Sequence, residues 1–281
     1  MAIEVRSAHQ ANYAAQVGSA VTQSLMRLVR SPSHSRRAEA RRALARRWLW
    51  LALAAALVIG TLMFAIDVTA IQLMPTRGTA WLWPLRIFTD LAKSTYVLWA
   101  LFAVLIVILL TLPRLNLISR PVLVAFGVRI QYLFFSVLVA MISGEIIKFV
   151  VGRGRPFVGG EANAFNYMHF SGSEAYSSLP SGHALTAFAL AFAVSSVWRK
   201  ATLVMIVYAV LICISRVVLL AHHPSDVVAG ALTGIIAAML VRYWFAARRL
   251  GFKIGRDGTI EPLAGPSWPA LKRVARDAFA P

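Results

Sequence analysis

Charged residues are scarce in this chain of 281 residues, and acidic residues are the scarcest. Only 14% of the residues are charged, with 11 Asp and Glu against 29 Lys and Arg, whereas 59% are hydrophobic. Such a composition, with the apolar residues gathered into long uncharged runs, is typical of a polytopic membrane protein. The single cysteine, Cys213, excludes a disulfide within the chain, and we expect it to serve in packing.

Six apolar runs approach the length of about 20 helical residues that crosses a bilayer core. They are approximately Trp48–Ala65, Tyr96–Leu112, Tyr132–Val151, Ala184–Trp198, Ala201–Ala221 and Val227–Ala246. We therefore predict an all-α fold, a polytopic membrane bundle with six transmembrane helices. The first run begins only at Trp48 and is longer than the apolar part of a signal peptide, so we expect it to be retained.

The basic residues are distributed unevenly between the two sides of this topology. Of the 29 Lys and Arg, 22 fall on the side of the two termini and 7 on the other side. The positive-inside rule then places both termini in the cytoplasm, in what we expect to be a bacterial inner membrane. We expect these charges to meet anionic lipids at the cytoplasmic face. The basic runs contain no recognisable nucleic-acid-binding module, so we predict no nucleic-acid partner.

The chain is predicted to have three parts. Residues 1–47 are expected to form a basic cytoplasmic tail, mostly disordered because it has too few apolar residues to fold alone. Within it, Val21, Leu25, Leu28 and Val29 share one helical face, which favours one interfacial helix. Residues 48–246 form the six-span domain, and residues 247–281 form a cytoplasmic tail in which Trp268–Ala275 suggests a second interfacial helix.

Three outer helix ends are expected to converge, and two of them carry cations. Lys148 lies in the last turn of the third run, and Gly152 and Gly154 break the helix so that Arg155 can fold back. Arg216 lies near the outer end of the fifth run. Arginine matches two phosphate oxygens with its planar fork, and lysine adds a compact charge. The cluster therefore predicts an oxyanion site that needs no metal.

The start of the fourth run adds donors to this site. The N–H groups of Ser181, Gly182 and His183 lack partners within a helix that begins there, and we expect them to point at the same anion. Two histidines suggest chemistry as well as binding, because cleavage of a phosphate ester needs a nucleophile and an acid. Asp226, four residues after His222, is expected to accept a hydrogen bond from that ring and to orient it.

These residues resemble the three-part signature of the type 2 phosphatidic acid phosphatase superfamily over about residues 48–246. The parts, in order, are Lys148 with Arg155-Pro156, then Pro180-Ser181-Gly182-His183, then Ser215-Arg216 with His222 and Asp226. The resemblance implies a phosphohistidine at His222, orientation of that ring by Asp226 and protonation of the leaving group by His183. It also implies that Lys148, Arg155, Ser181, Gly182 and Arg216 bind phosphate, without a metal ion or other cofactor.

Simpler interpretations exist for single residues. Lys148 could extend to the membrane surface or pair with Glu145, one turn earlier. His223 is unremarkable by itself, and His169 is expected to be a surface residue. Arg153 lies between two motif residues, so it could reach the phosphate or face water, and it is left outside the catalytic set.

The predicted function is hydrolysis of a lipid phosphate monoester or diphosphate at the periplasmic face. Candidate substrates are phosphatidylglycerol phosphate, phosphatidic acid, an isoprenyl diphosphate and lipid A, and the loop aromatic residues do not distinguish them. The same signature occurs in vanadium haloperoxidases, but those enzymes are soluble, so the six predicted spans do not favour this class. A non-enzymatic transporter or sensor of lipid phosphates is the alternative, although its polar groups would be expected to extend through the membrane depth.

Overall fold

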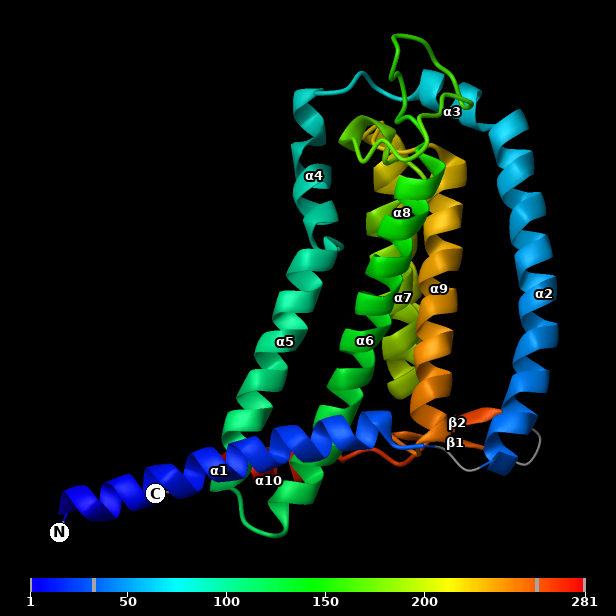
Figure 1. Cartoon of the computed structure of the whole chain (residues 1–281). Helices are drawn as coiled ribbons and strands as arrows, with labels where there is room; N and C mark the ends of the chain where they lie inside the picture. Colours follow the sequence, from blue (N-terminus) through cyan, green and yellow to red (C-terminus); the bar gives the residue numbers. More distant parts are fainter. Residues whose placement is uncertain (1, 32–33, 256–257, 280–281) are drawn as a thin grey trace. The chain divides into compact units, whose positions relative to one another are not determined.

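The computed structural model describes residues 2–31, 34–255 and 258–279, which are mostly helical (Figure 1). The long helices are α1 (Ala2–Val29), α2 (His34–Ala65), α5 (Ser94–Thr111), α6 (Ser119–Val151), α7 (Gly182–Val197), α8 (Thr202–Val218), α9 (Pro224–Ala247) and α10 (Trp268–Phe279). The short helices are α3 (Asp67–Leu73) and α4 (Trp83–Asp90). Two strands, β1 (Phe252–Ile254) and β2 (Ile260–Pro262), form an antiparallel hairpin, which the all-α prediction did not include.

The six apolar runs lie in α2, α5, α6, α7, α8 and α9 and end within a few residues of these helices. Helices α2 and α6 begin well before their runs, at His34 and Ser119 in place of Trp48 and Tyr132. By length and composition, four helical segments of the described chain could cross a membrane: Ala80–Arg114, Ser119–Val151, Arg199–Val218 and Pro224–Ala247. A fifth is possible if Ala52–Ala65 and Asp67–Leu73, which are bent by 54°, form one broken span. Helix α7 is shorter, with 16 residues. The helical class is therefore confirmed, and the count of six spans stays a prediction.

The chain divides into two compact units, which are described separately. The first comprises Met1–Ala40, Ala100–Tyr132 and Tyr243–Pro281, and the second comprises Arg41–Trp99 and Leu133–Arg242.

The core of the second unit is formed where α6, α7 and α9 pack closely. Val137 of α6, Leu185 and Ala189 of α7, and Ala237 of α9 belong to one buried cluster. Gly234 makes the approach of α9 to α7 possible, since a Cβ atom there would lie 2.2 Å from the Leu185 carbonyl oxygen. Small residues allow helix backbones to come this close. The consequence is that the first turns of α7 and α9 lie against each other.

Helix α8 covers another side of α7. Ala187 and Ala191 of α7 pack with Ala209 and Ile212 of α8. The same cluster includes Ala92, which directly follows α4. The last turn of α8 is thereby held beside the first turn of α7.

The loop after α6 folds back across the end of that helix. Gly152 has φ +58°, and a Cβ atom there would lie 1.8 Å from the Met168 carbonyl oxygen, so only glycine fits. The Met168 N–H donates to the Gly152 carbonyl over 2.7 Å, and the Arg155 N–H donates to the Ala175 carbonyl over 2.9 Å. As predicted, the helix ends at Val151 and the chain turns there.

Most of residues 1–47, of which residues up to Ala40 belong to the first unit, is helical in the structure, whereas a mostly disordered tail was expected. Helix α1 covers Ala2–Val29, and α2 already begins at His34. Ala20 packs against the core cluster of this unit, and the Gln131 side chain donates to Ser24 Oγ over 2.6 Å. The Tyr13 hydroxyl also donates to the Leu110 carbonyl of α5. The partners of α1 are thus far away in sequence, so the apolar pattern of this segment alone did not reveal them.

Candidate functional site

The three motifs meet at one end of α6, α7, α8 and α9 in the second unit. A Cβ atom on Gly182 would lie 3.3 Å from Lys148 Nζ, so the first motif touches the second. The Ser181 N–H donates to the Asp226 carbonyl over 2.9 Å, so the second touches the third. Arg155 and Arg216 are close enough to His222 to influence its charge. We call Lys148, Arg155, Ser181, His183, Arg216 and His222 the motif cluster.

Several polar atoms of this cluster are buried without a hydrogen-bond partner among the residues that the structure describes. They are Arg155 Nε, Ser181 Oγ, His183 Nε2 and Arg216 Nε. Buried polar atoms in folded proteins nearly always have a partner, so a group of exceptions calls for an explanation. Two arginine donors, a hydroxyl and an imidazole at adjoining helix ends are suited to an oxyanion. The arrangement can therefore bind a phosphate group.

His222 lies between α8 and α9 and is only 3% exposed. Its Nδ1 lies 2.8 Å from the Ser178 carbonyl oxygen. A carbonyl can only accept, so Nδ1 must carry the hydrogen and Nε2 keeps its lone pair in the neutral ring. Burial lowers the pKa of His222 well below its usual value; the Asp226 carboxylate opposes this shift, and Arg216 and Arg155 add to it. The geometry can thus present a neutral imidazole nitrogen as a nucleophile.

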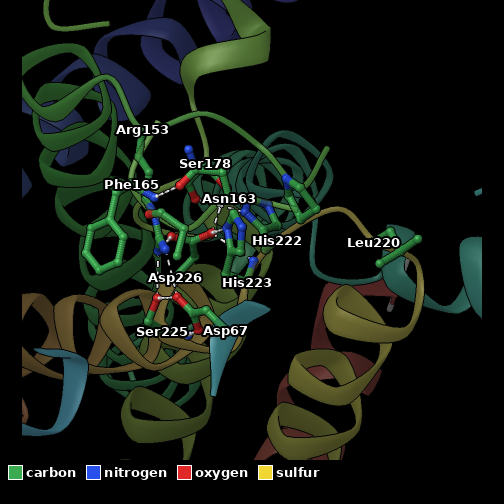
Figure 2. A network of polar contacts seen from close by, with 12 residues as sticks. Asp67, Arg153, Asn163, Phe165, Ser178, Leu220, His222, His223, Ser225 and Asp226 are labelled. Atoms are coloured by element: carbon green, nitrogen blue, oxygen red, sulfur yellow. Dashed lines mark hydrogen bonds and ion pairs between the residues drawn. The ribbon is translucent and has the colours of Figure 1, made fainter. Parts of the chain in front are cut away.

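The expected hydrogen bond from His222 to Asp226 is replaced by other contacts (Figure 2). Asp226 Oδ2 accepts from Ser178 Oγ at 2.6 Å and from the His223 N–H at 2.8 Å, and it lies 3.1 Å from His223 Nδ1. Ser178 therefore bridges the two residues, since its hydroxyl binds the carboxylate while its carbonyl binds His222. Asp226 lies three residues after His223, and at the start of α9 its carboxylate turns towards His223 and not towards His222, which the sequence could not predict.

Arg153 does not belong to the phosphate-facing cations. It is 1% exposed, and its guanidinium donates to the Ala164 carbonyl over 3.0 Å, to Ser225 Oγ and Asp226 Oδ1 over 2.6 Å each, and to Asp67 Oδ2 over 2.7 Å. Burial alone would lower its pKa, but Asp226 and Asp67 outweigh burial and raise it. Figure 2 shows this guanidinium between the two carboxylates. Arg153 is thus a buried counter-ion beneath the site.

Asp67, which sequence reasoning missed, completes the buried network. Its Oδ1 accepts from the Ser225 N–H at 2.9 Å, and Ser225 Oγ also donates to its carboxylate. A signal was present: Asp67 is the only acidic residue between Trp48 and Thr89, in an apolar stretch. A lone carboxylate in such a stretch indicates function or a specific partner. Asp67 fixes the first turn of α9 to the start of α3.

Some predicted phosphate donors already have partners. Lys148 Nζ lies 2.7 Å from Glu145, as one simpler interpretation expected, and Arg155 Nη2 lies 3.3 Å from Glu174, which is 87% exposed. The Ser181 N–H is used by the Asp226 carbonyl, which corrects the expectation that this N–H faces the anion. Its hydroxyl, without a partner, is the group that remains available. Exposed ion pairs are weak, so an anion could compete for both cations.

Two further side chains, those of Arg77 and His169, lie outside the motif cluster. Arg77 Nη2 donates to the Leu220 carbonyl over 2.6 Å and holds the loop that precedes His222, a role that sequence reasoning did not assign. His169 is exposed and stacks on Tyr167, in agreement with its expected surface position.

The fold and the site define a class: a helical protein with helices of membrane-spanning length and a cationic cluster around a buried histidine at one end of the bundle. The family model of the PAP2 superfamily matches residues 129–250 of the chain. The predicted resemblance is thereby confirmed.

Three known proteins are similar to the chain. A lipid A 1-phosphatase of Rhizobium johnstonii is 34% identical over 147 residues, or 52% of this chain and 57% of the relative. A lipid A 1-phosphatase of Rhizobium etli is 32% identical over 53% of this chain and 61% of the relative. A bacitracin transport permease protein BcrC of Bacillus licheniformis is 31% identical over 42% of this chain and 55% of the relative. The chain thus spans less than two thirds of each relative. No solved structure is significantly similar to it.

Proposed function

We propose that the protein is a membrane lipid phosphatase that removes phosphate from a lipid at the periplasmic face through a phosphohistidine intermediate. The observation that carries this proposal is the group of buried, unpartnered donors of Arg155, Ser181, His183 and Arg216 around a histidine whose Nε2 is free to attack. Similarity to two lipid A 1-phosphatases supports the same conclusion. The motif cluster is the proposed active site.

The first chemical step transfers the phosphoryl group to His222. Lys148, Arg155 and Arg216 neutralise the phosphate oxygens, and Nε2 of His222 attacks phosphorus. The P–N bond forms as the P–O bond to the lipid breaks, and His183 gives a proton to the departing lipid oxygen. The ring then carries positive charge, which the nearby Asp226 carboxylate stabilises.

The second step returns the enzyme to its starting state. His183, now without that proton, removes one from a water molecule, and the water oxygen attacks phosphorus. The P–N bond breaks, its electron pair returns to Nε2, and inorganic phosphate leaves. Three cations supply the charge neutralisation, so we propose that the reaction needs no metal ion.

We propose the 1-phosphate of lipid A as the first substrate to test, because two relatives carry that activity in their names. The motif cluster lies at helix ends, which suits a phosphate at headgroup height while the acyl chains stay in lipid. Phosphatidylglycerol phosphate, phosphatidic acid and an isoprenyl diphosphate are the other substrates to test.

The test is phosphate release by purified protein in the presence of EDTA, with lipid A and the other lipid phosphates as substrates. His222→Ala should abolish release, and rapid acid-free quenching of wild type with ³²P-labelled substrate should trap a phosphoprotein that the variant lacks. His169→Ala, which changes an exposed histidine of the loop between α6 and α7, is the matched control and should retain activity. Release by His222→Ala at the wild-type rate would exclude the proposed nucleophile.

A non-enzymatic lipid phosphate transporter is the second candidate, favoured by the similarity to a bacitracin transport permease protein. A transporter needs the cations but no nucleophile. It would move labelled lipid across reconstituted vesicles without releasing phosphate, and His222→Gln would leave that movement intact. The phosphatase releases phosphate from lipid in detergent, where no transport is possible.

A further inference from the structure

The first unit contains a cavity rich in arginine that is separate from the motif cluster. Its volume is about 390 Å³, within the range of roughly 300 to 1,000 Å³ that is usual for small-molecule sites. The eleven lining residues include five arginines and no Asp or Glu: Arg27, Arg30, Arg129, Arg248 and Arg249. We call this the arginine cavity.

The positive charge of the cavity is not balanced by carboxylates of the described residues. Arg129 is only 6% exposed, and its guanidinium donates to two backbone carbonyls, of Ala125 over 2.6 Å and of Leu263 over 2.9 Å. Within residues 2–31, 34–255 and 258–279, Arg27, Arg30 and Arg249 form no ion pair. A buried arginine is usually paired with an anion, so the counter-ion of Arg129 is expected to come from a ligand, which the exposed Arg27, Arg30 and Arg249 at the rim of the cavity can also contact.

The walls of the arginine cavity are held in place by contacts within the first unit. The Trp244 indole N–H donates to the Leu28 carbonyl over 3.1 Å, which attaches α1 to the end of α9. On the other wall, Phe252 of the hairpin packs edge-on against Tyr132, with ring centroids 4.8 Å apart. A site that is already formed loses little freedom on binding, which favours a ligand.

The surroundings of the cavity favour a ligand with an apolar portion. Leu25, Met26 and Val29 are exposed large apolar residues on α1, next in sequence to Arg27 and Arg30. A helix with exposed apolar and cationic residues suits the boundary between headgroups and acyl chains. The cavity also lies on the side of the topology that carries most of the basic residues, where anionic lipid headgroups are expected.

We propose that the arginine cavity binds the phosphate group of an anionic membrane lipid. Guanidinium groups bind phosphate oxygens in pairs, and the number of arginines here can satisfy one headgroup phosphate from several directions. This site is independent of the proposed phosphatase reaction, since none of its residues belongs to the motif cluster. It would attach α1 to the bilayer through a specific lipid.

The test measures lipid binding by the full chain in neutral detergent, using native mass spectrometry. Phosphatidylglycerol and phosphatidylcholine with the same acyl chains are added in steps, and inorganic phosphate is added in a separate arm. The variant is Arg27→Gln with Arg30→Gln, because both side chains are exposed and have no described partner. The matched control is Arg273→Gln with Arg276→Gln, which removes two exposed charges from α10 in the same unit.

We expect wild type to bind one phosphatidylglycerol in preference to phosphatidylcholine. The Arg27 and Arg30 variant should bind it roughly tenfold more weakly or worse, as the loss of two arginine–phosphate interactions implies, and the control should change less than about twofold. Equal losses in both variants would show unspecific charge attraction and overturn the proposal. Inorganic phosphate binding as tightly as phosphatidylglycerol would identify a soluble ligand and overturn the lipid assignment.

Discussion

Replacing Arg153 by Met should destabilise the protein strongly, although this arginine lies beneath the reacting groups. Its guanidinium is bonded to Asp67 and Asp226 at 2.7 and 2.6 Å, and the side chain is fully buried. Met keeps the length of the stem and removes the charge, so two carboxylates lose their cation in a buried place. Removing one partner of a buried pair costs about 3 to 5 kcal/mol. That is a large part of the roughly 5 to 15 kcal/mol that stabilises a typical domain.

The matched control is Arg155→Met, two residues further along. Arg155 pairs with Glu174, which is 87% exposed, so this variant should lose less than about 1 kcal/mol. Its activity should fall nevertheless, since its Nε is one of the unpartnered buried donors of the motif cluster. The two arginines are therefore expected to separate stability from phosphate binding.

The assay for this pair is unfolding in mixed micelles, with increasing SDS, followed by circular dichroism, alongside phosphate release at saturating lipid. Arg153→Met should unfold at a clearly lower SDS fraction than wild type, whereas Arg155→Met should unfold close to wild type. Equal unfolding midpoints for the two variants would refute the assignment of Arg153 as a buried counter-ion. Asp67→Asn, which removes one of the two carboxylates, should partly restore the stability of Arg153→Met.

Two further predictions concern His222 and Gly234. Because the pKa of His222 lies well below the value of about 6.5 in the unfolded chain, the unfolded state gains a proton there as pH falls below about 6.5 while the folded state does not. The free energy of unfolding should therefore decrease from pH 6.5 towards 5, and its slope against pH should be smaller in His222→Gln. The kcat/KM of wild type should not fall near pH 6.5. The same slope in the variant and in wild type would contradict the buried neutral ring. Gly234→Ala should prevent close packing of α9 on α7, since its Cβ would lie 2.2 Å from the Leu185 carbonyl oxygen. Gly60→Ala is the control and should be tolerated, because its Cβ would meet nothing within 4 Å. Similar yields of folded protein from the two variants on size-exclusion chromatography would argue against this packing.

Much of the site could be predicted from the sequence because it depends on where apolar runs end. The polar residues at 148, 155, 181–183, 216 and 222 interrupt or end these runs, and alternate crossings of a membrane bring such ends to one side. The helical segments followed from the same runs. The hairpin and the full extent of helix in the first segment, where only one interfacial helix was predicted, could not be obtained in this way, since short strands and a weakly apolar helix depend on distant partners.

By itself, then, the sequence determined the helical class, the ends at which the cations gather and the match of residues 129–250 to the family model of the PAP2 superfamily. Only the tertiary structure decided which cation is buried with Asp67 and Asp226 and which faces the motif cluster, because Arg153 and Arg155 are two residues apart with the same chemistry. The tertiary structure also placed Ser178 between His222 and Asp226. The physical reason is that apolar runs are a local property of the chain, whereas a hydrogen bond between residues far apart in sequence depends on how the helices and loops pack.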